Sequence, residues 1–291
     1  MTVTHHTLVW GHHRMELGQC TRIMGILNIT PDSFSDGGKF FALDAALARA
    51  EQMAADGADI LDIGGESTRP FSESVSADEE TRRVVPVISY LAKKIPIPIS
   101  IDTNKALVAR RAVAAGASII NDVSALRFDN EMAAVAAEND VLLVLMHMKG
   151  TPADMQVAPV YDDLMGEVKN FLRQAVVRAE AAGVSRKKII IDPGIGFGKT
   201  VDHNLALIHR LNELHDLDLP LLLGSSRKAF IRKILGEARQ AQFPPDHPVV
   251  EIGTQATIAA GILSGAHIVR VHDVASTVAT VRIVDAIRNA F

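Results

Sequence analysis

The stretch "KIIIDPGIGFGKT", Lys188–Thr200, joins a short apolar run to a segment rich in glycine. The run from Ile189 to Ile191 is too short for a helix and lacks polar alternation, as in a strand buried on both faces. Asp192 follows at the end of this run. The stretch therefore predicts a buried parallel strand that ends in a carboxylate and a turn.

The glycine segment ends in Gly-Lys-Thr, like the second half of a phosphate-binding P-loop. That loop needs four residues between its first glycine and the Gly-Lys pair, and the first glycine position here is Pro193. Asp192 would also repel the phosphates of a nucleotide. We interpret the glycines as a bend that lets Phe197 and Lys199 clear the rim of a pocket, with a P-loop NTPase as the rival interpretation.

The same pattern of a short apolar run and a longer amphipathic segment occurs eight times. The other seven runs cover residues 22–28, 58–65, 97–102, 117–122, 141–147, 219–226 and 267–273. Helices are expected between them, among others at 44–56, 105–115 and 161–182. Eight such units favour a closed parallel (β/α)8 TIM barrel over an open sheet. Residues 6–19 are expected to form a hairpin that caps the barrel floor, and the whole chain, 1–291, is expected to be a single domain.

Composition narrows the possible partners and locations. The formal net charge is −4, and there is no basic tract, so neither nucleic acid nor an anionic membrane is expected to bind. No apolar run approaches 18 residues, and the N-terminal residues lack an apolar signal core. Cys20 is the single cysteine, so no internal disulfide can form. These features predict a soluble cytoplasmic protein.

In a TIM barrel the chemistry lies where strands end and their following loops begin. Almost every predicted strand ends there in a residue that can bind a ligand: Asn28, Asp62, Asp102, Asn121, Met146, Asp192, Ser226 with Lys228, and Arg270 with His272. Helix capping can explain any one of them, but not so many at one end. Asp102, Asn121 and Asp192 would crowd together unless a ligand rich in N–H donors lay between them, which favours a flat heterocycle.

Cationic side chains occur on other strands. Arg270 and His272 directly precede a helix expected to begin near Asp273, and a helix N-terminus is a site for anions such as diphosphate. Alternatively, His272 and Asp273 only cap that helix. Lys228 begins another helix, where the dipole disfavours a cation, so a ligand acceptor or Asp192 explains it better. A surface lysine remains the alternative.

Eight motifs, in this order, are similar to those of the dihydropteroate synthases. They are "IMGILNITPDSFSDGGKF", "DIGGESTRP", "ISIDT", "IINDVSAL", "MHMKGTPADMQ", "DPGIGFGKT", "GSSRK" and "IVRVHDV", within Ile23–Val274. The resemblance implies a transferase that condenses 6-hydroxymethyl-7,8-dihydropterin diphosphate with para-aminobenzoate, giving 7,8-dihydropteroate and diphosphate. It also implies Mg²⁺ and a homodimer formed through the late helices.

The resemblance implies roles for individual residues. Asp102, Asn121 and Asp192 grip the pterin, and Lys228 lies on its carbonyl side. Four further residues complete the pterin and diphosphate sites: Met146 packs on the ring, Arg270 stacks over it and reaches the diphosphate, His272 holds the diphosphate, and Asn28 is the protein ligand of Mg²⁺. The aminobenzoate pocket and its surroundings are formed by Phe34, Asp36, Thr68, Arg69, Pro70, Phe197, Gly224 and Ser226. The catalytic set is Asp36, Lys228, Arg270 and His272, with Asp36 stabilising the cation that forms when diphosphate leaves.

Two positions depart from the family pattern. Ala229 follows Ser-Arg-Lys where many members have serine, and no arginine precedes Gly253. Backbone N–H groups at the start of that helix are then expected to bind more of the aminobenzoate carboxylate. A methyltransferase using methyltetrahydrofolate is the alternative within the same fold, but it has no use for a diphosphate site.

Overall fold

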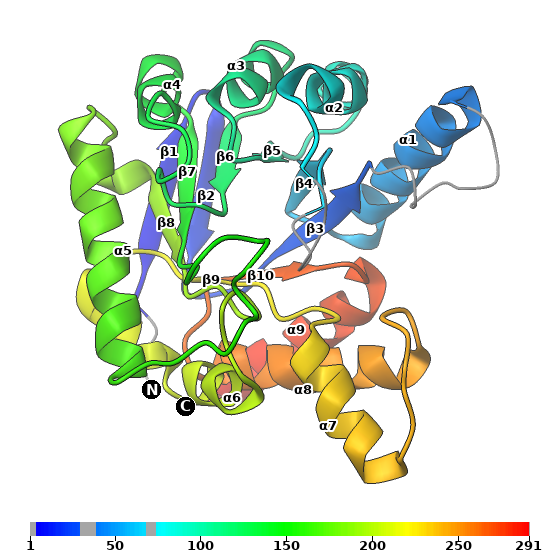
Figure 1. The fold of residues 1–291 in the computed structure, drawn as a ribbon. Coiled ribbons are helices and arrows are strands. Elements are labelled where there is room, and N and C mark those ends of the chain that lie inside the picture. Colours follow the sequence, from blue (N-terminus) through cyan, green and yellow to red (C-terminus); the bar gives the residue numbers. More distant parts are fainter. Residues whose placement is uncertain (1–3, 30–38, 68–73, 291) are drawn as a thin grey trace.

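The computed structural model describes residues 4–29, 39–67 and 74–290. Within them, eight parallel strands form a ring with helices outside it (Figure 1). The strands of the ring are β3 (Arg22–Asn28), β4 (Ile60–Gly64), β5 (Ile99–Asp102), β6 (Ile119–Asp122), β7 (Leu142–Met146), β8 (Ile189–Asp192), β9 (Leu222–Leu223) and β10 (Ile268–Val271). Hydrogen bonding runs in the order β8-β7-β6-β5-β4-β3-β10-β9, and a parallel bridge between Ile191 and Leu221 joins β8 to the β9 segment. The predicted TIM barrel is confirmed.

Helices follow the strands and cover the outside of the barrel. They are α1 (Lys39–Asp56), α2 (Ala77–Leu91), α3 (Ala106–Ala114), α4 (Met132–Asn139), α5 (Leu164–Ala181), α6 (Val201–His209), α7 (Ala229–Arg239), α8 (Pro248–Leu263) and α9 (Val274–Arg288), with 3-10 turns η2 (Arg186–Lys188) and η3 (Leu211–Leu217). Several begin at side-chain caps of the kind expected from the sequence. Asp163 accepts a hydrogen bond from the backbone of Gly166, and Asp273 accepts one from Ser276.

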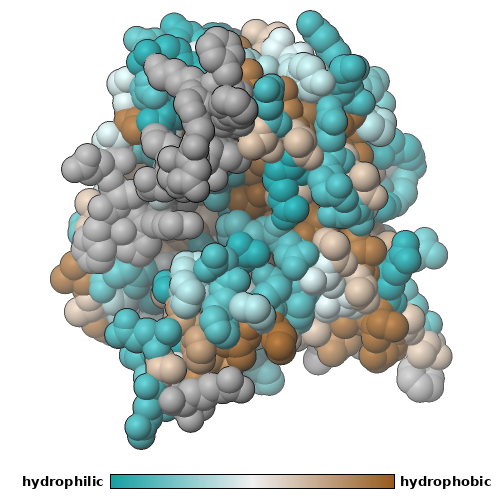
Figure 2. All heavy atoms as spheres, turned by 90° about the vertical axis from the view of Figure 1, so that its right-hand side faces the viewer, coloured by the Kyte–Doolittle hydropathy of each residue, from teal (hydrophilic) through white to brown (hydrophobic). Residues whose placement is uncertain are grey.

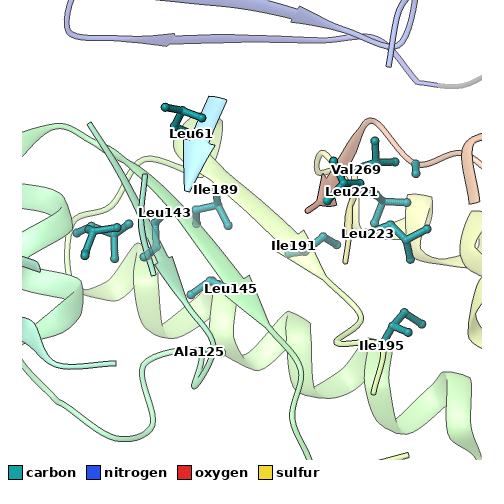
Figure 3. Close-up of a cluster of buried hydrophobic side chains, with 14 of the residues drawn as sticks. Leu61, Ala125, Leu143, Leu145, Ile189, Ile191, Ile195, Leu221, Leu223 and Val269 are labelled. Carbon is teal, nitrogen blue, oxygen red and sulfur yellow. The ribbon is translucent and has the colours of Figure 1, made fainter. Parts of the chain in front are cut away.

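Side chains alternate between the two faces of each strand, because successive residues of a strand point in opposite directions. One face packs under the helices in a large apolar layer. Figure 3 shows part of it, with Leu143 and Leu145 of β7 next to Ile189 and Ile191 of β8. Burying each such side chain contributes about 1.5–3 kcal/mol, so this layer is the main source of cohesion between the barrel and its helices.

The other face points into the barrel, and its lower layer is apolar. β1 (His6–Trp10) and β2 (His13–Leu17) form an antiparallel hairpin that packs against this layer. The packed side chains are Leu8, Trp10, Met15 and Leu17 of the hairpin with Met24, Ile60, Ile119, Leu142, Val144, Ile190, Leu222 and Ile268 of the strands. The Trp10 indole also donates to the Ser118 hydroxyl over 3.1 Å. The expected hairpin therefore closes the N-terminal end of the barrel.

The element bounds differ most from expectation at β9 and at the start of α1. β9 contains only Leu222 and Leu223 of the run predicted at 219–226, since Pro220 has no N–H and contributes only its carbonyl, which accepts from Ile191. α1 begins at Lys39 rather than residue 44, because no glycine or proline lies between to stop it. Within the described residues, none of the helices has the length and apolar character needed to cross a membrane.

Candidate active site

A polar layer lies directly above the apolar floor of the barrel. Inward side chains recur every second residue, so the floor residue of six strands is followed two positions later by a residue of this layer. The pairs are Ile60 and Asp62, Ile119 and Asn121, Val144 and Met146, Ile190 and Asp192, Leu222 and Gly224, and Ile268 and Arg270. Asp102 ends β5 beside Asn121, its partner in register. The structure thus brings together the central set of residues predicted from the strand ends.

Arg270 lies among the carboxylates. Its Nε donates to Oδ2 of Asp62, and its Nη2 donates to Oδ2 of Asp102, each over 2.6 Å. Asn121 donates from Nδ2 to the same Asp62 oxygen over 3.0 Å. Arg270 is on a different strand from these acids, as the sequence shows, but its side chain reaches across the inside of the barrel to meet them. Burial by itself would lower the pKa of Arg270. The negative charges of Asp62 and Asp102 outweigh this effect, so the pKa lies above its usual value.

Burial makes the carboxyl groups of Asp102 and Asp192 weaker acids than usual. It raises the pKa of Asp102 to about 7, against the opposing effect of Arg270, and the pKa of Asp192 to about 6. Asp192 accepts a hydrogen bond from the backbone N–H of Gly194 over 2.7 Å. Oδ1 of Asp102 is buried and has no hydrogen-bond partner among the described residues. The layer therefore holds acceptor capacity that a ligand bearing N–H groups can satisfy.

Lys228 and Phe197 form one wall next to this layer. Lys228 is the N-cap residue of α7, and its Nζ lies 4.0 Å from the centre of the Phe197 ring. Burial, together with Arg270, lowers the pKa of Lys228 to about 8. Phe197 packs in a small apolar cluster with Val123, Met146, Met148 and Met155. Lys228 is thus not a solvated surface residue, and Met146 and Phe197 give the site an apolar side.

His272, which follows β10, contacts Ser226, which follows the neighbouring strand β9. The Ser226 hydroxyl lies 2.9 Å from Nδ1 of His272 and accepts from the backbone N–H of His272 over 3.3 Å. The Ser226 hydroxyl can act as donor or acceptor toward Nδ1, according to the tautomer of the ring, and in either case it holds the imidazole in place. Asp273, and not His272, supplies the side-chain cap of α9. The ring of His272 is thus held near the start of that helix.

The glycine segment is folded against the chain that follows β7. A Cβ on Gly194 would overlap the carbonyl oxygen of His147, and one on Gly198 would lie 2.6 Å from the carbonyl oxygen of Lys149. Both glycines have positive φ, +70° and +66°, which side chains rarely adopt. The close approach, rather than phosphate binding, explains why glycine is needed at these positions.

The N–H groups of this segment are used internally. Gly194 donates to Asp192, Gly196 donates to Asn204, and Thr200 is the N-cap of α6 in a capping box with His203. A P-loop directs such N–H groups and its threonine to phosphate and metal. The P-loop interpretation is therefore not supported by the geometry.

Lys199 is buried, so the expectation that it clears a pocket rim is wrong. Its Nζ donates to the carbonyl oxygen of Phe197 and lies 2.9 Å from Nδ1 of His147. Burial lowers the pKa of Lys199 to about 7, and burial together with Lys199 lowers the pKa of His147. Lys199 thus holds the turn that carries Phe197.

Several predicted residues lie outside the described part of the chain, namely Phe34, Asp36, Thr68, Arg69 and Pro70. Asn28 ends β3, and its Oδ1 lies close to Gly64, 3.6 Å from where a Cβ on that glycine would be. No group of three or more His, Cys, Asp or Glu side chains in the described residues could hold a metal ion. A metal at Asn28 would therefore take few ligands from the described part of the chain.

Two features of the site go beyond the residues predicted from the sequence. Asp62 is one of the strand-end residues but has no role in the predicted pterin set, although its spacing from Ile60 places it inside the barrel. Lys105 contacts Glu66 and the buried Glu80, joining α2 to the residues after β4. The alternation of inward side chains along β4 is the only sequence signal for Asp62. No local sequence pattern indicates the contacts of Lys105 with Glu66 and Glu80.

Comparisons with known proteins identify a family. Residues 24–272 match the family model described as pterin binding enzyme. The chain is 47% identical over 277 residues to a dihydropteroate synthase from Synechocystis sp., covering 95% of this chain and 93% of that one.

Two solved dihydropteroate synthases share the fold. One, from Yersinia pestis in a sulfonamide drug complex, has a TM-score of 0.90 at 43% identity, covering 98% of this chain and 100% of that one. The other, from Xanthomonas albilineans in complex with 7,8-dihydropteroate, has a TM-score of 0.85 at 40% identity, covering 97% and 99%. The chain belongs to the pterin-binding enzyme family and, within it, to the dihydropteroate synthases, which are transferases.

Proposed function

We propose that the chain condenses 6-hydroxymethyl-7,8-dihydropterin diphosphate with para-aminobenzoate, forming 7,8-dihydropteroate and diphosphate. The observation that carries this proposal is the polar layer, in which Asp102, Asn121 and Asp192 meet around Arg270 above a closed apolar floor. Buried carboxylates beside an amide suit a flat ring whose edge bears several N–H donors. A ligand that satisfies them removes the cost of leaving buried acceptors unpaired.

In the proposed complex each side chain of the layer has a distinct partner on the pterin. Asp102, Asn121 and Asp192 bind the amino group and ring nitrogens, and Lys228 donates to the carbonyl oxygen. Met146 packs on one face of the ring. Arg270 stacks on the ring, because a planar guanidinium can stack and donate at the same time.

The diphosphate is proposed to lie at the start of α9. There the Nε2–H of His272, oriented by Ser226, donates to a diphosphate oxygen, and Arg270 approaches from the pterin side. Each charge-assisted hydrogen bond contributes roughly 1.5–3 kcal/mol. If these bonds strengthen as charge develops on the leaving group, they lower the barrier to C–O cleavage.

Mg²⁺ is proposed as the cofactor, with Asn28 as its protein ligand. Mg²⁺ usually takes only one or two ligands from the protein and the rest from phosphates and water, so a single amide oxygen fits an ion bound together with diphosphate. When bound, the ion neutralises charge on the leaving diphosphate. Asn28 at the end of β3 would hold it at the mouth of the barrel.

The aminobenzoate is proposed to bind beside Phe197 and Ser226, with residues Phe34, Asp36, Thr68, Arg69 and Pro70 completing the pocket and Gly224 leaving room at its base. The carboxylate of aminobenzoate would meet the first turn of α7, where Lys228 makes no side-chain cap and Ala229 has no hydroxyl. Asp36 would stabilise the cation on the methylene group. The amine of aminobenzoate is a neutral nucleophile and needs no strong base.

Mass spectrometry of a reaction with both substrates and Mg²⁺ tests the activity. We expect a product with the mass of 7,8-dihydropteroate, formed only when both substrates are present. Methyl transfer from methyltetrahydrofolate without that product would favour the alternative methyltransferase of the same fold. Hydrolysis of ATP instead would favour the NTPase.

We also propose a cytoplasmic homodimer whose subunit is one domain over residues 1–291. Support for the dimer comes from exposed isoleucines on the last two helices, Ile252 on α8 and Ile283 and Ile287 on α9, which are 70%, 64% and 59% exposed. Figure 2 shows apolar surface on the face that carries the late helices. Large exposed apolar side chains on two neighbouring helices favour an interface there.

Sedimentation velocity tests the dimer with charged substitutions. We expect Ile252→Asp combined with Ile283→Asp to sediment as a monomer, because a buried unpaired carboxylate opposes association. Val177→Asp is the control, since Val177 on α5 is also exposed, at 58%. A wild-type protein that sediments as a monomer at all concentrations would contradict the proposal.

A further inference from the structure

Asp62 is a fully buried carboxylate at the centre of the polar layer. It lies on β4 between Ile60, which is part of the floor, and Gly64, which ends the strand. Its Oδ2 accepts two hydrogen bonds, from Nε of Arg270 over 2.6 Å and from Nδ2 of Asn121 over 3.0 Å. Asp62 therefore joins Asn121, a residue predicted to bind the pterin, to Arg270, the main cation of the site.

The bond to Asp62 fixes which way the Asn121 amide faces. A carboxylate only accepts hydrogen bonds, so the amide must turn its NH₂ group toward Asp62 and its oxygen away from it. With the opposite orientation, two oxygens would face each other in a buried setting. Asn121, which is 4% exposed, therefore presents an acceptor to a ligand in the layer.

The bond to Asp62 also limits how the Arg270 guanidinium can bind Asp102. Arg270 spans the two carboxylates with different nitrogens, Nε on Asp62 and Nη2 on Asp102, which fixes the plane of the guanidinium. One oxygen of Asp102, Oδ1, remains without a partner in the described part of the chain. Without Asp62, the guanidinium could turn and bind both oxygens of Asp102.

We propose that Asp62 is a positioning residue of the pterin site. It acts through Asn121 and Arg270, presenting the amide oxygen of one and the flat face of the other, and it leaves Oδ1 of Asp102 for the ligand. The pattern of acceptors in the layer, and hence its preference for a ring edge with N–H donors, then depends on a residue that lies among the ring-binding side chains without being assigned a contact with the ring. This inference rests on the proposed function, because it concerns the same pterin site.

Asp62→Asn tests the proposal, since it keeps the size of the side chain and removes the charge. We expect the dissociation constant of pteroic acid, measured by calorimetry on the full-length protein, to rise about tenfold or more. The KM of the pterin diphosphate should rise in parallel, while the KM of para-aminobenzoate stays within twofold. A merely structural residue would lower the melting temperature without separating the two substrates.

Asp122→Asn is the matched control. Asp122 is on β6, is equally buried, and accepts bonds from the backbone of Ser124 and Leu126 and from the Ser124 hydroxyl, with none to Asn121 or Arg270. We expect this variant to melt at a lower temperature with unchanged affinity for pteroic acid. If Asp62→Asn fails to fold, Asp62→Ser replaces it, and the same rise in dissociation constant is expected.

A double-mutant cycle tests whether Asp62 acts through Asn121. In the Asn121→Ala background, Asp62→Asn should change the affinity for pteroic acid by less than half of its effect in wild type on a logarithmic scale. Unchanged affinity in the single variant, or fully additive effects, would overturn the proposal. If the wild-type protein binds no pteroic acid at all, the proposed function fails instead, and the two failures are thus distinct.

Discussion

Nη2 of Arg270 donates to Oδ2 of Asp102 over 2.6 Å, so a carboxylate expected to bind the pterin is already paired with the cation expected to stack on it. The other oxygen of Asp102 is buried without a partner in the described residues. The two side chains form one unit in which the guanidinium keeps a buried acid partly charged and the acid keeps the guanidinium in place. Changes at either residue should therefore affect the pterin site more than the fold.

Asp102→Asn should weaken pterin binding about 10- to 100-fold, since one charge-assisted hydrogen bond is worth roughly 1.5–3 kcal/mol. Burial raises the pKa of Asp102 to about 7, so the accepting carboxylate is present above that pH. Wild-type affinity should fall as the pH drops through about 7. Calorimetry at several pH values checks this, and a variant with the wild-type pH profile would contradict it.

Lys228→Ala should weaken pterin binding about tenfold, because the ammonium group is proposed to donate to the ring carbonyl. Calorimetry with pteroic acid measures the change. Lys233→Ala is the control on the same helix, since the Lys233 side chain is 64% exposed. Equal affinities of wild type and Lys228→Ala would exclude Lys228 from the pocket.

Ser226→Ala should weaken inhibition by diphosphate about three- to tenfold, the value of one ordinary hydrogen bond, because the His272 ring would lose the hydroxyl contact that holds it near the start of α9. Initial rates with added diphosphate give the inhibition constant. The neighbouring Ser225→Ala is the control, as Ser225 accepts from Thr257 instead. The same inhibition constant in both variants would show that Ser226 does not orient His272.

Asp36→Ala should leave pterin binding nearly unchanged and lower turnover, by about 10²-fold if Asp36 stabilises the forming cation. Single-turnover rates combined with calorimetry separate the two effects. Asp44→Ala provides a control at an exposed acid on α1. Equal losses of binding and turnover would argue against this role.

His267→Asn should reduce the acid sensitivity of folding. Nδ1 of His267 accepts from the backbone of Leu221, so the ring is neutral with its proton on Nε2, which donates to Thr4. Burial lowers the pKa of His267 to about 3. Between pH 6.5 and 3 the unfolded chain therefore binds the proton more tightly, and stability is lost as the pH falls.

One such group contributes a slope of about 1.4 kcal/mol per pH unit in that window. Urea unfolding of wild type and His267→Asn from pH 7 to 4 measures the difference. The variant should be less stable at pH 7, where it loses the bond to Thr4, but its stability should fall less steeply with acid. Parallel curves would show that His267 is not the residue responsible.

The barrel and the polar layer could be predicted from the sequence because both follow from short-range rules. Apolar runs mark the strands, and a polar residue at the end of a run lies at the mouth in any closed parallel barrel. Asp102, Asn121 and Asp192 could therefore be placed near one another without coordinates. β3 even has the predicted bounds, Arg22–Asn28.

The contacts of long side chains could not be predicted in the same way. Arg270 reaches from β10 to Asp62 on β4 and Asp102 on β5, which depends on barrel diameter and side-chain conformation rather than on spacing in the sequence. Lys199 looked like a rim residue, but its pairing with His147 requires knowing how the glycine turn packs on the chain after β7. Such contacts join residues far apart in the sequence, where no periodicity carries information.

The floor, the outer layer and the polar layer occupy separate positions along most strands of the ring. Residues that provide cohesion are thereby kept apart from those that provide recognition. A redesign for a different heterocycle could begin with Asp62, Asn121, Asp192 and Arg270 while retaining the hairpin and the helix-facing side chains unchanged. Such a barrel can acquire new chemistry with little effect on the packing that keeps it folded.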